Sequence, residues 1–274
     1  MSKTLRNLLF CTGIGFCLPA FAAPQVLYDI NQTGNLPTEA GWLAGGFAFS
    51  SQTLTPQGAQ VAPLLAGNST LGGYANHTSV ISLFPQLQVS NGPLVNALFP
   101  ALDRNAGFAL SLGFRIIEES HSGNPNRAGF SVILVGQDLK GIEIGFQNDR
   151  IFAQNDGVAL FTAGENTVDP LFVGRAFAAH NRWDLNVQGT SYALVQGGTT
   201  ILSGALRDYS SYSGFGQDAY RTPNFVFFGD NTTSARGAFL VDYAAITAVP
   251  EPAPFALFMA GVALIAGLRR ARAA

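Results

Sequence analysis

Acid–base chemistry on a glycosidic bond needs two carboxyl groups on one face of a site, and this sequence offers two places to look for them. Glu143 lies in the stretch 141–146, which has the alternation of a β-strand. Gly145 and Asn148, two and five positions later, carry no carboxyl group. Glu118 and Glu119 are adjacent, so on a strand their side chains point to opposite faces. The sequence therefore predicts no hydrolase site at either place.

Side chains that bind metals are scattered along the sequence. The three histidines have no cysteine or second histidine at zinc-ligand spacing: His77, His121 and His180. Calcium takes oxygen ligands from loops, and five candidates occupy consecutive predicted turns: Asp138, Asn148, Asp149, Asn155 and Asp156. Because Asn and Asp are also the usual turn residues, we interpret these positions as plain turns. The sequence predicts no metal site and leaves calcium as the one cofactor still open.

A polar, glycine-rich stretch at 208–220 has the composition of a binding loop. Three tyrosines in it are candidates for glycan contact through exposed rings: Tyr209, Tyr212 and Tyr220. The alternative is that these rings cover an edge of the fold. Trp183, in an alternating apolar segment, is expected to pack in the core.

Short alternating segments separated by Gly, Asn and Asp predict an all-β protein with little helix. The expected strands are 108–117, 128–135, 142–146, 158–161, 183–187, 191–195, 199–203, 224–229 and 239–247. Region 23–103 is interrupted by prolines, so we expect long loops and short strands there, with candidates at 26–30 and 42–49. Together these segments predict one domain, 23–248, folded as an antiparallel jelly-roll sandwich.

The first 22 residues have the order of a secretory signal peptide. Lys3 and Arg6 precede an apolar run at 8–18, which is too short for a comfortable membrane span. The small residues around the expected cleavage site, which starts the mature chain at Ala23, are Ala20, Ala22 and Ala23. Signal peptidase is the partner that this leader implies.

Removing the two ends changes the charge and thiol content of the chain. Both cysteines, Cys11 and Cys17, lie in the leader, so the mature protein has no disulfide. Of the 15 Lys and Arg, five lie in the leader and tail, and of the 17 Asp and Glu one does. The remaining 10 basic and 16 acidic residues give a net charge near −6, which disfavours nucleic-acid binding.

The C-terminal segment 249–274 combines a proline-rich stretch, an apolar run at 255–268 and a basic end. The proline-rich motif is Pro250, Glu251 and Pro252, and the basic residues are Arg269, Arg270 and Arg272. This order resembles the PEP-CTERM sorting signal. The resemblance implies a short transmembrane helix at 255–268 that holds the protein in the inner membrane, with the arginines in the cytoplasm, until an exosortase cuts near the motif. The alternative is an ordinary anchor that stays uncut.

Four segments of the middle region are similar to bacterial laminin-G-like or concanavalin-like jelly rolls: 127–133, 141–146, 202–209 and 228–232. Hydrolases of that fold carry Glu-x-Asp-x-x-Glu, which the segment starting at Glu143 lacks. We therefore expect a non-enzymatic exported protein of the cell surface or extracellular matrix, associated with exopolysaccharide. A lectin-like carbohydrate-binding module is the alternative, and a polysaccharide-active enzyme with an unrecognised site is the third hypothesis.

Overall fold

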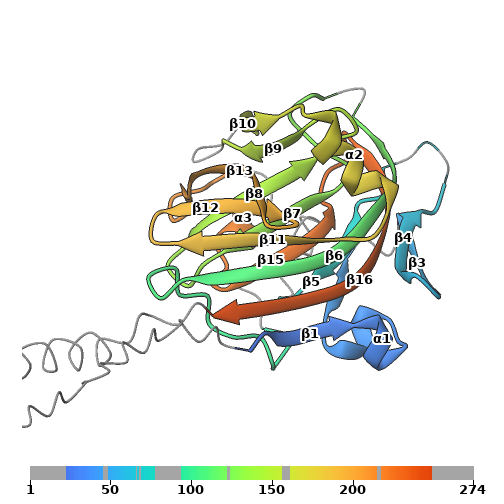
Figure 1. Cartoon of the computed structure of the whole chain (residues 1–274), viewed down its shortest axis with the longest axis horizontal. Coiled ribbons are helices and arrows are strands. Elements are labelled where there is room, and N and C mark those ends of the chain that lie inside the picture. Colours follow the sequence, from blue (N-terminus) through green and yellow to red (C-terminus); the bar gives the residue numbers. More distant parts are fainter. Residues whose placement is uncertain are drawn as a thin grey trace, which may run out of the picture.

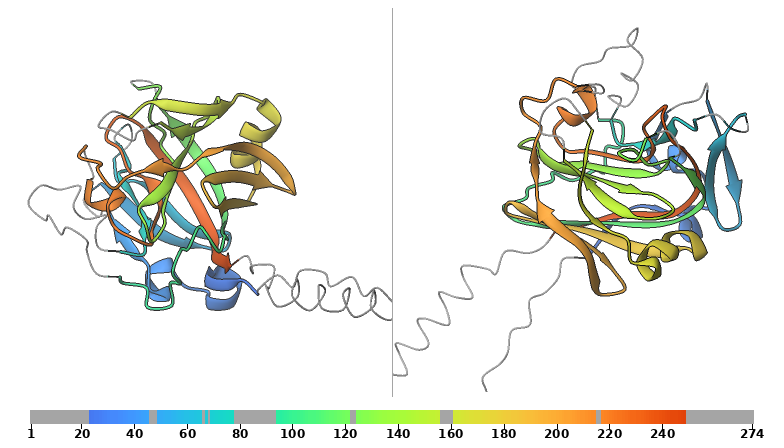
Figure 2. Two further views of the ribbon diagram at one scale, coloured as in Figure 1. Left: turned by 90° about the vertical axis from the view of Figure 1, so that its left-hand side faces the viewer. Right: turned by 90° about the horizontal axis from the view of Figure 1, so that it is seen from above.

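The protein is described by a computed structural model that covers residues 23–45, 49–65, 67, 69–77, 94–121, 124–155, 161–214 and 217–248. Two antiparallel sheets pack face to face, as the two layers in Figure 2 show. The predicted all-β sandwich is therefore confirmed. The predictions for the leader and for the tail concern residues outside the described ones. Among the described residues, no helix is long and apolar enough to cross a membrane.

Sheet A contains, in spatial order, β13 (Thr199–Ala205), β12 (Ser191–Gln196), β11 (Asn181–Gln188), β6 (Phe108–Ser120), β16 (Arg236–Ala248), β4 (Gly58–Pro63) and β3 (Ser50–Thr55), with β1 (Gln25–Asp29) also paired to β16. Sheet B contains β10 (Ala163–Thr167), β9 (Ile151–Gln154), β8 (Lys140–Phe146), β7 (Ser131–Val135), β15 (Phe225–Asp230), β5 (Gly72–Ala75) and β2 (Leu43–Gly45), with β14 (Arg207–Asp208) paired to β8. The long strands β6 and β16 run side by side through sheet A (Figure 1).

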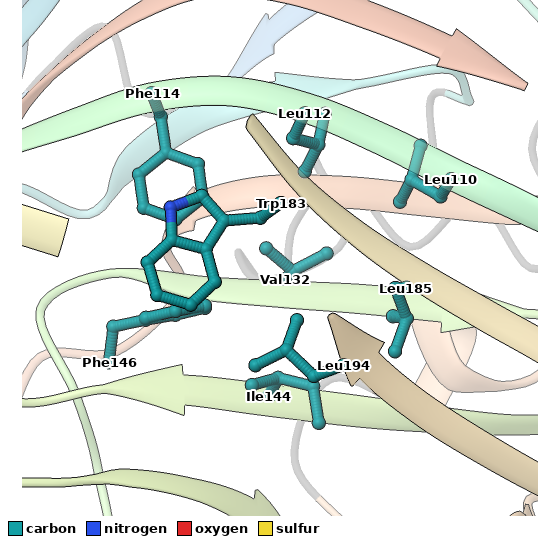
Figure 3. Close-up of a pocket in the computed structure, with 9 residues that line it drawn as sticks. All are labelled: Leu110, Leu112, Phe114, Val132, Ile144, Phe146, Trp183, Leu185 and Leu194. Carbon is teal, nitrogen blue, oxygen red and sulfur yellow. The ribbon is translucent and has the colours of Figure 1, made fainter. Parts of the chain in front are cut away.

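The core between the sheets follows from the period of two along each strand. On β6, the inward side chains are Leu110, Leu112, Phe114 and Ile116. At its centre, the ring of Phe146 lies 5.1 Å from Phe114, 5.8 Å from Phe130 and 5.3 Å from Trp183. Trp183 is 2% exposed, which confirms its predicted place in the core. The apolar residues around these rings enclose a cavity of about 10 Å³ (Figure 3).

The structure confirms most of the predicted strands and adds elements in the proline-containing region. The 191–195 and 199–203 segments form β12 and β13 of the expected meander beside β11. The hairpin of β3 and β4 and the short β5 were not identified from the sequence. The expected strand at 158–161 lies mainly outside the described residues.

Four helices accompany the sheets among the described residues: α1 (Ile30–Thr33), the 3₁₀ helix η1 (Pro37–Ala40), α2 (Pro170–Ala178) and α3 (Gln217–Tyr220). Sequence analysis missed α2, although its start has a readable signal. The Asp169 side chain accepts a hydrogen bond from the Leu171 backbone N–H at 2.9 Å, and Pro170 occupies the first helical position. The helix buries Val173 and Ala176 against the main core.

Replacing Phe146 with alanine should lower the free energy of unfolding by about 3–5 kcal/mol, because the cavity it leaves among three aromatic rings cannot collapse fully. Urea denaturation followed by tryptophan fluorescence measures this change, since Trp183 lies against the replaced ring. Val168→Ala is the control: Val168 is 66% exposed, so its loss should cost less than about 0.5 kcal/mol. Equal effects of the two substitutions would contradict this packing.

Candidate functional site

The outer face of sheet B, which points away from sheet A, carries a second apolar layer. Inward residues of β7 and β15 pack in the main core, and the alternate ones pack outward. The outward apolar side chains are Ile133, Val135, Phe225 and Phe227. Such a face must be covered by another part of the chain, a partner or a ligand.

Residues 207–214 and 217–224, here called the covering segment, lie over this face. Figure 2 shows the part that carries α3 on the side of sheet B away from sheet A. The segment begins as β14, where Arg207 pairs with Gly141 and Asp208 pairs with Lys140. The Tyr209 backbone N–H then donates to the Leu139 carbonyl at 2.9 Å. These backbone bonds bring the tyrosines that follow onto the outer face.

The three candidate tyrosines are buried, so the hypothesis that they form an exposed platform for glycans is wrong; as in its alternative, the rings cover a part of the fold. Tyr209, Tyr212 and Tyr220 are 0%, 1% and 2% exposed. Their ring centroids lie 4.8 Å apart for Tyr212 and Tyr220, and 5.0 Å apart for Tyr209 and Tyr220. The physical reason is the apolar face beneath them, whose burial outweighs the hydration of three phenol rings. Their rings form a closed layer of the fold.

Glu143 lies in the centre of the same face and is fully buried. Its Oε2 accepts a hydrogen bond from the Tyr220 hydroxyl, and its Oε1 accepts one from Asn231 Nδ2 at 3.1 Å. Arg127 Nη2 lies 3.6 Å from the same Oε1 and donates to Asn231 Oδ1 at 2.8 Å. The structure thus brings together two features that the sequence analysis treated separately, the strand of Glu143 and the tyrosine-rich stretch.

Arg127 completes the cluster, and it shares a contact with the Phe161 ring, whose centroid lies 6.1 Å from that of Tyr220. The Arg127 guanidinium lies 3.9 Å from the centroid of the Phe161 ring, a cation–π contact. A buried charge without a partner would cost several kcal/mol, and here the carboxylate and the guanidinium compensate each other. Both Glu143 oxygens are already engaged and the side chain has no contact with solvent. The arrangement can hold the covering segment in place, but it does not present a carboxyl group to a substrate.

A second buried carboxyl group fixes the loop that leads into β5. Asp230 Oδ2 accepts hydrogen bonds from the backbone N–H groups of Thr70 at 3.0 Å and Leu71 at 3.1 Å. Its Oδ1 accepts one from the Thr232 N–H at 3.0 Å. Burial raises the pKa of Asp230 to about 8, against the opposing effect of these backbone donors and of Arg127.

The remaining acidic candidates have structural partners. Glu119 is buried and accepts hydrogen bonds from the N–H groups of Gly129 at 3.1 Å and Asn148 at 2.9 Å, whereas Glu118 is exposed beside Arg236. The two side chains therefore point to opposite faces, as predicted. His121 Nδ1 lies 3.0 Å from Glu119 Oε2.

The turn residues considered as calcium ligands do not converge. Asp138 Oδ2 accepts a hydrogen bond from Arg104 Nε at 2.7 Å, and the Asp149 carboxylate lies 3.8 Å from His121 Nε2. The Asn155 carbonyl accepts from the Thr162 hydroxyl. Asp156 lies outside the described residues. Within the described part of the chain, no group of three or more His, Cys, Asp or Glu side chains could hold a metal ion.

The residues predicted for processing are mostly outside the described ranges. These are Ala20, Ala22, Pro250, Glu251, Pro252, Arg269, Arg270 and Arg272. Ala23 is described and exposed at the start of the domain.

No known family model matches the chain, and no curated protein is similar to it. Solved structures with a related fold include a carbohydrate esterase from Shiga toxin-encoding bacteriophage phi24B, at 13% identity and a TM-score of 0.46 over 82% of this chain and 99% of that one. A galectin-like protein of unknown function from Bacillus subtilis matches at 10% identity and 0.46, over 84% and 97%. The exoplasmic/lumenal domain of VIP36, solved with Ca²⁺ and Man3GlcNAc, matches at 10% and 0.46, over 81% and 87%. Likeness at this level transfers no ligand or activity to this chain.

Replacing Tyr220 with phenylalanine should lower the free energy of unfolding by about 1–3 kcal/mol, because it leaves Oε2 of the buried Glu143 without its donor. Tyr192→Phe is the matched control, since the buried Tyr192 hydroxyl has no hydrogen-bond partner among the described residues. Urea denaturation compares the two variants. A loss in Tyr192→Phe as large as in Tyr220→Phe would show that the hydrogen bond to Glu143 is not the cause.

Asp230 should make stability fall as pH rises. The folded state keeps the carboxyl proton up to a pKa of about 8, whereas the unfolded chain releases it near about 3.9. Between these values the folded state binds more protons, so the free energy of unfolding decreases with increasing pH. Asp230→Asn lacks this titration and should give a flatter profile between about pH 4 and 8. Parallel profiles of the two proteins would contradict the raised pKa.

Proposed function

We infer that this chain is a non-enzymatic exported protein of the cell surface or extracellular matrix, sorted by its C-terminal tail and associated with exopolysaccharide. The observation that carries the proposal is the order of features after the last strand. β16 ends at Ala248, and the Pro250-Glu251-Pro252 motif follows almost directly. The apolar run 255–268 and the three arginines complete the tail.

The length of the proposed membrane helix suits a protein that is held in the inner membrane only until its tail is cut. At about 1.5 Å per residue, the run 255–268 gives about 21 Å of helix, which is shorter than the hydrocarbon core of about 30 Å. It can span the membrane if the bilayer thins or the arginines snorkel, and the arginines orient it with its end in the cytoplasm. The prolines at 250 and 252 favour an extended backbone that a protease can bind.

The edge of the sandwich next to the tail also carries the start of the mature chain. β1 pairs antiparallel with the last part of β16, with Gln25 opposite Ile246 and Tyr28 opposite Ala244. In Figure 1 the start of β1 lies close to the end of β16. Leader and tail would therefore approach the membrane from one edge of the domain, and this edge would face the inner membrane before processing.

The proposal includes no catalytic role, because the buried acidic side chains already have partners within the fold. Glu143, the acidic residue on the outer face of sheet B, is sealed beneath the covering segment. Asp230 and Glu119 are occupied by backbone donors. None of the three presents a carboxyl group to a bound sugar, so the proposal assigns the domain no hydrolysis.

Intact-mass measurement of the surface protein from the host, with and without its exosortase, tests the sorting proposal. With the enzyme present, the mature protein should begin at Ala23 and lack residues 255–274; without it, the tail should remain. Glu251→Ala should leave insertion intact but block processing, whereas glutamate at 269, 270 and 272 should weaken the orientation and cause mis-sorting. A tail that persists in both strains would mean that the protein is simply membrane-anchored.

A further inference from the structure

The outer face of sheet A, unlike that of sheet B, carries charged and polar side chains. Because Leu112, Phe114 and Ile116 of β6 point into the core, Gly113 and Arg115 point outward. Arg115 lies opposite Leu240 of β16. One step along the sheet, Gly113 lies between Arg182 of β11 and Tyr243 of β16.

Arg182 is exposed and preorganised. Its guanidinium lies 3.3 Å from the centroid of the Tyr243 ring, and it forms no hydrogen bond or ion pair with another described residue. A guanidinium stacked on a ring keeps its in-plane N–H groups, which form the fork that binds a carboxylate through two hydrogen bonds. The ring thus fixes the orientation of a cation whose donors remain available.

Arg115 supplies a second guanidinium near the first. Its Nε donates to the Phe177 carbonyl at 3.0 Å, and no acidic side chain among the described residues pairs with it. From the register, Arg115 and Arg182 are diagonal neighbours on adjacent strands, with Cα atoms about 7–8 Å apart. Other described arginines, such as Arg104 and Arg207, are neutralised by carboxylates.

Two carboxylates share the face with this pair. Asp242, the extra residue at a bulge of β16, lies beside them, and its Oδ2 is 3.5 Å from His180 Nδ1. Asp184, two positions after Arg182 on the same face of β11, accepts a hydrogen bond from the Ser111 hydroxyl. Burial lowers the pKa of His180, and Arg115 and Arg182 lower it further against the opposing effect of Asp242. The two arginines therefore share this face with two carboxylates, each of which has a partner of its own: His180 for Asp242 and the Ser111 hydroxyl for Asp184.

Arg115 also lines a groove of about 330 Å³ beside the β3–β4 hairpin. Its polar side includes Gln57 and Gln60, whose amides both donate and accept hydrogen bonds, as sugar hydroxyls require. Ile117, 44% exposed, and Leu240 give it an apolar floor. A chain of acidic sugars has carboxylates for the guanidinium groups, hydroxyls for the amides and ring faces for the apolar side chains.

We propose that the outer face of sheet A binds an acidic polysaccharide, with Arg115 and Arg182 holding carboxylates and the groove beside Gln57 and Gln60 holding the sugar rings. The proposal deepens the exopolysaccharide association proposed above and rests on it. It places the site on the face opposite the buried tyrosines, so it does not require the covering segment to open.

Titration calorimetry of the full-length chain in mild detergent, with polygalacturonate and its carboxyl-reduced neutral form, tests this site. Polygalacturonate should bind and the neutral form should not, and added salt should weaken binding. Arg115→Gln and Arg182→Gln should each lower affinity at least about tenfold, and Arg182→Lys should fall between wild type and Arg182→Gln because it keeps the charge without the fork. Thermal melting checks that each variant is folded.

Arg221→Gln is the control, because it removes one positive charge, as Arg182→Gln does, but far from the proposed site. Arg221 is exposed on the covering segment, over sheet B. It should bind like the wild type. The proposal is overturned if wild type does not bind, if the neutral polymer binds equally well, if Arg221→Gln weakens binding as much as Arg182→Gln, or if polyglutamate binds more tightly than polygalacturonate. Each of these results would leave the tail-processing experiment unaffected, and an uncut tail would leave this binding unchanged.

Discussion

The carboxylate of Glu143 connects three parts of the chain that are distant in sequence. Tyr220 from the covering segment, Asn231 from the end of β15 and Arg127 before β7 all meet it beneath the surface. A buried carboxylate must keep such partners, because losing one leaves a charge or a donor without compensation. This requirement fixes the covering segment on sheet B and so decides which face of the sandwich remains open.

The two outer faces consequently have different roles. Sheet B is covered on both sides, which is why every residue of β7 and β15 is buried. Sheet A keeps a polar outer face, with Arg182 exposed on it. A ligand as large as a polysaccharide can reach only a surface of the second kind without unfolding part of the chain. The fold therefore separates a face whose polar groups are satisfied internally from a face that stays open to solvent.

Sequence patterns predicted those features that depend on local order. The period of two identified β6, and the alternation around Trp183 placed that ring in the core. Both predictions work because the alternation within a single strand shows which of its side chains point inward. The hypothesis of an exposed platform in the tyrosine-rich stretch was wrong for the opposite reason. Its local composition is that of an exposed loop, while its burial depends on Phe225 and on a hydrogen bond to Glu143, 77 positions away. No local pattern encodes such a partner.

The site on sheet A was missed for a related reason. Arg115 and Arg182 are 67 positions apart in the sequence, and only the antiparallel pairing of β6 with β11 makes them neighbours. Gly113 between them carries no side chain, which leaves room for Asp242 at the bulge of β16. A register and a bulge are properties of strand pairing, so the sequence alone did not reveal this cluster.

The closure of sheet B by its own tyrosines is tested most directly by nitration with tetranitromethane, mapped by peptide mass spectrometry. Of the seven tyrosines in the chain, Tyr243 is the one that the structure leaves partly exposed, on the outer face of sheet A. The native protein should be nitrated at Tyr243, while Tyr209, Tyr212 and Tyr220 should react only after unfolding in urea. Rapid nitration of these three in the native protein would show that the covering segment does not close the face and would contradict the account.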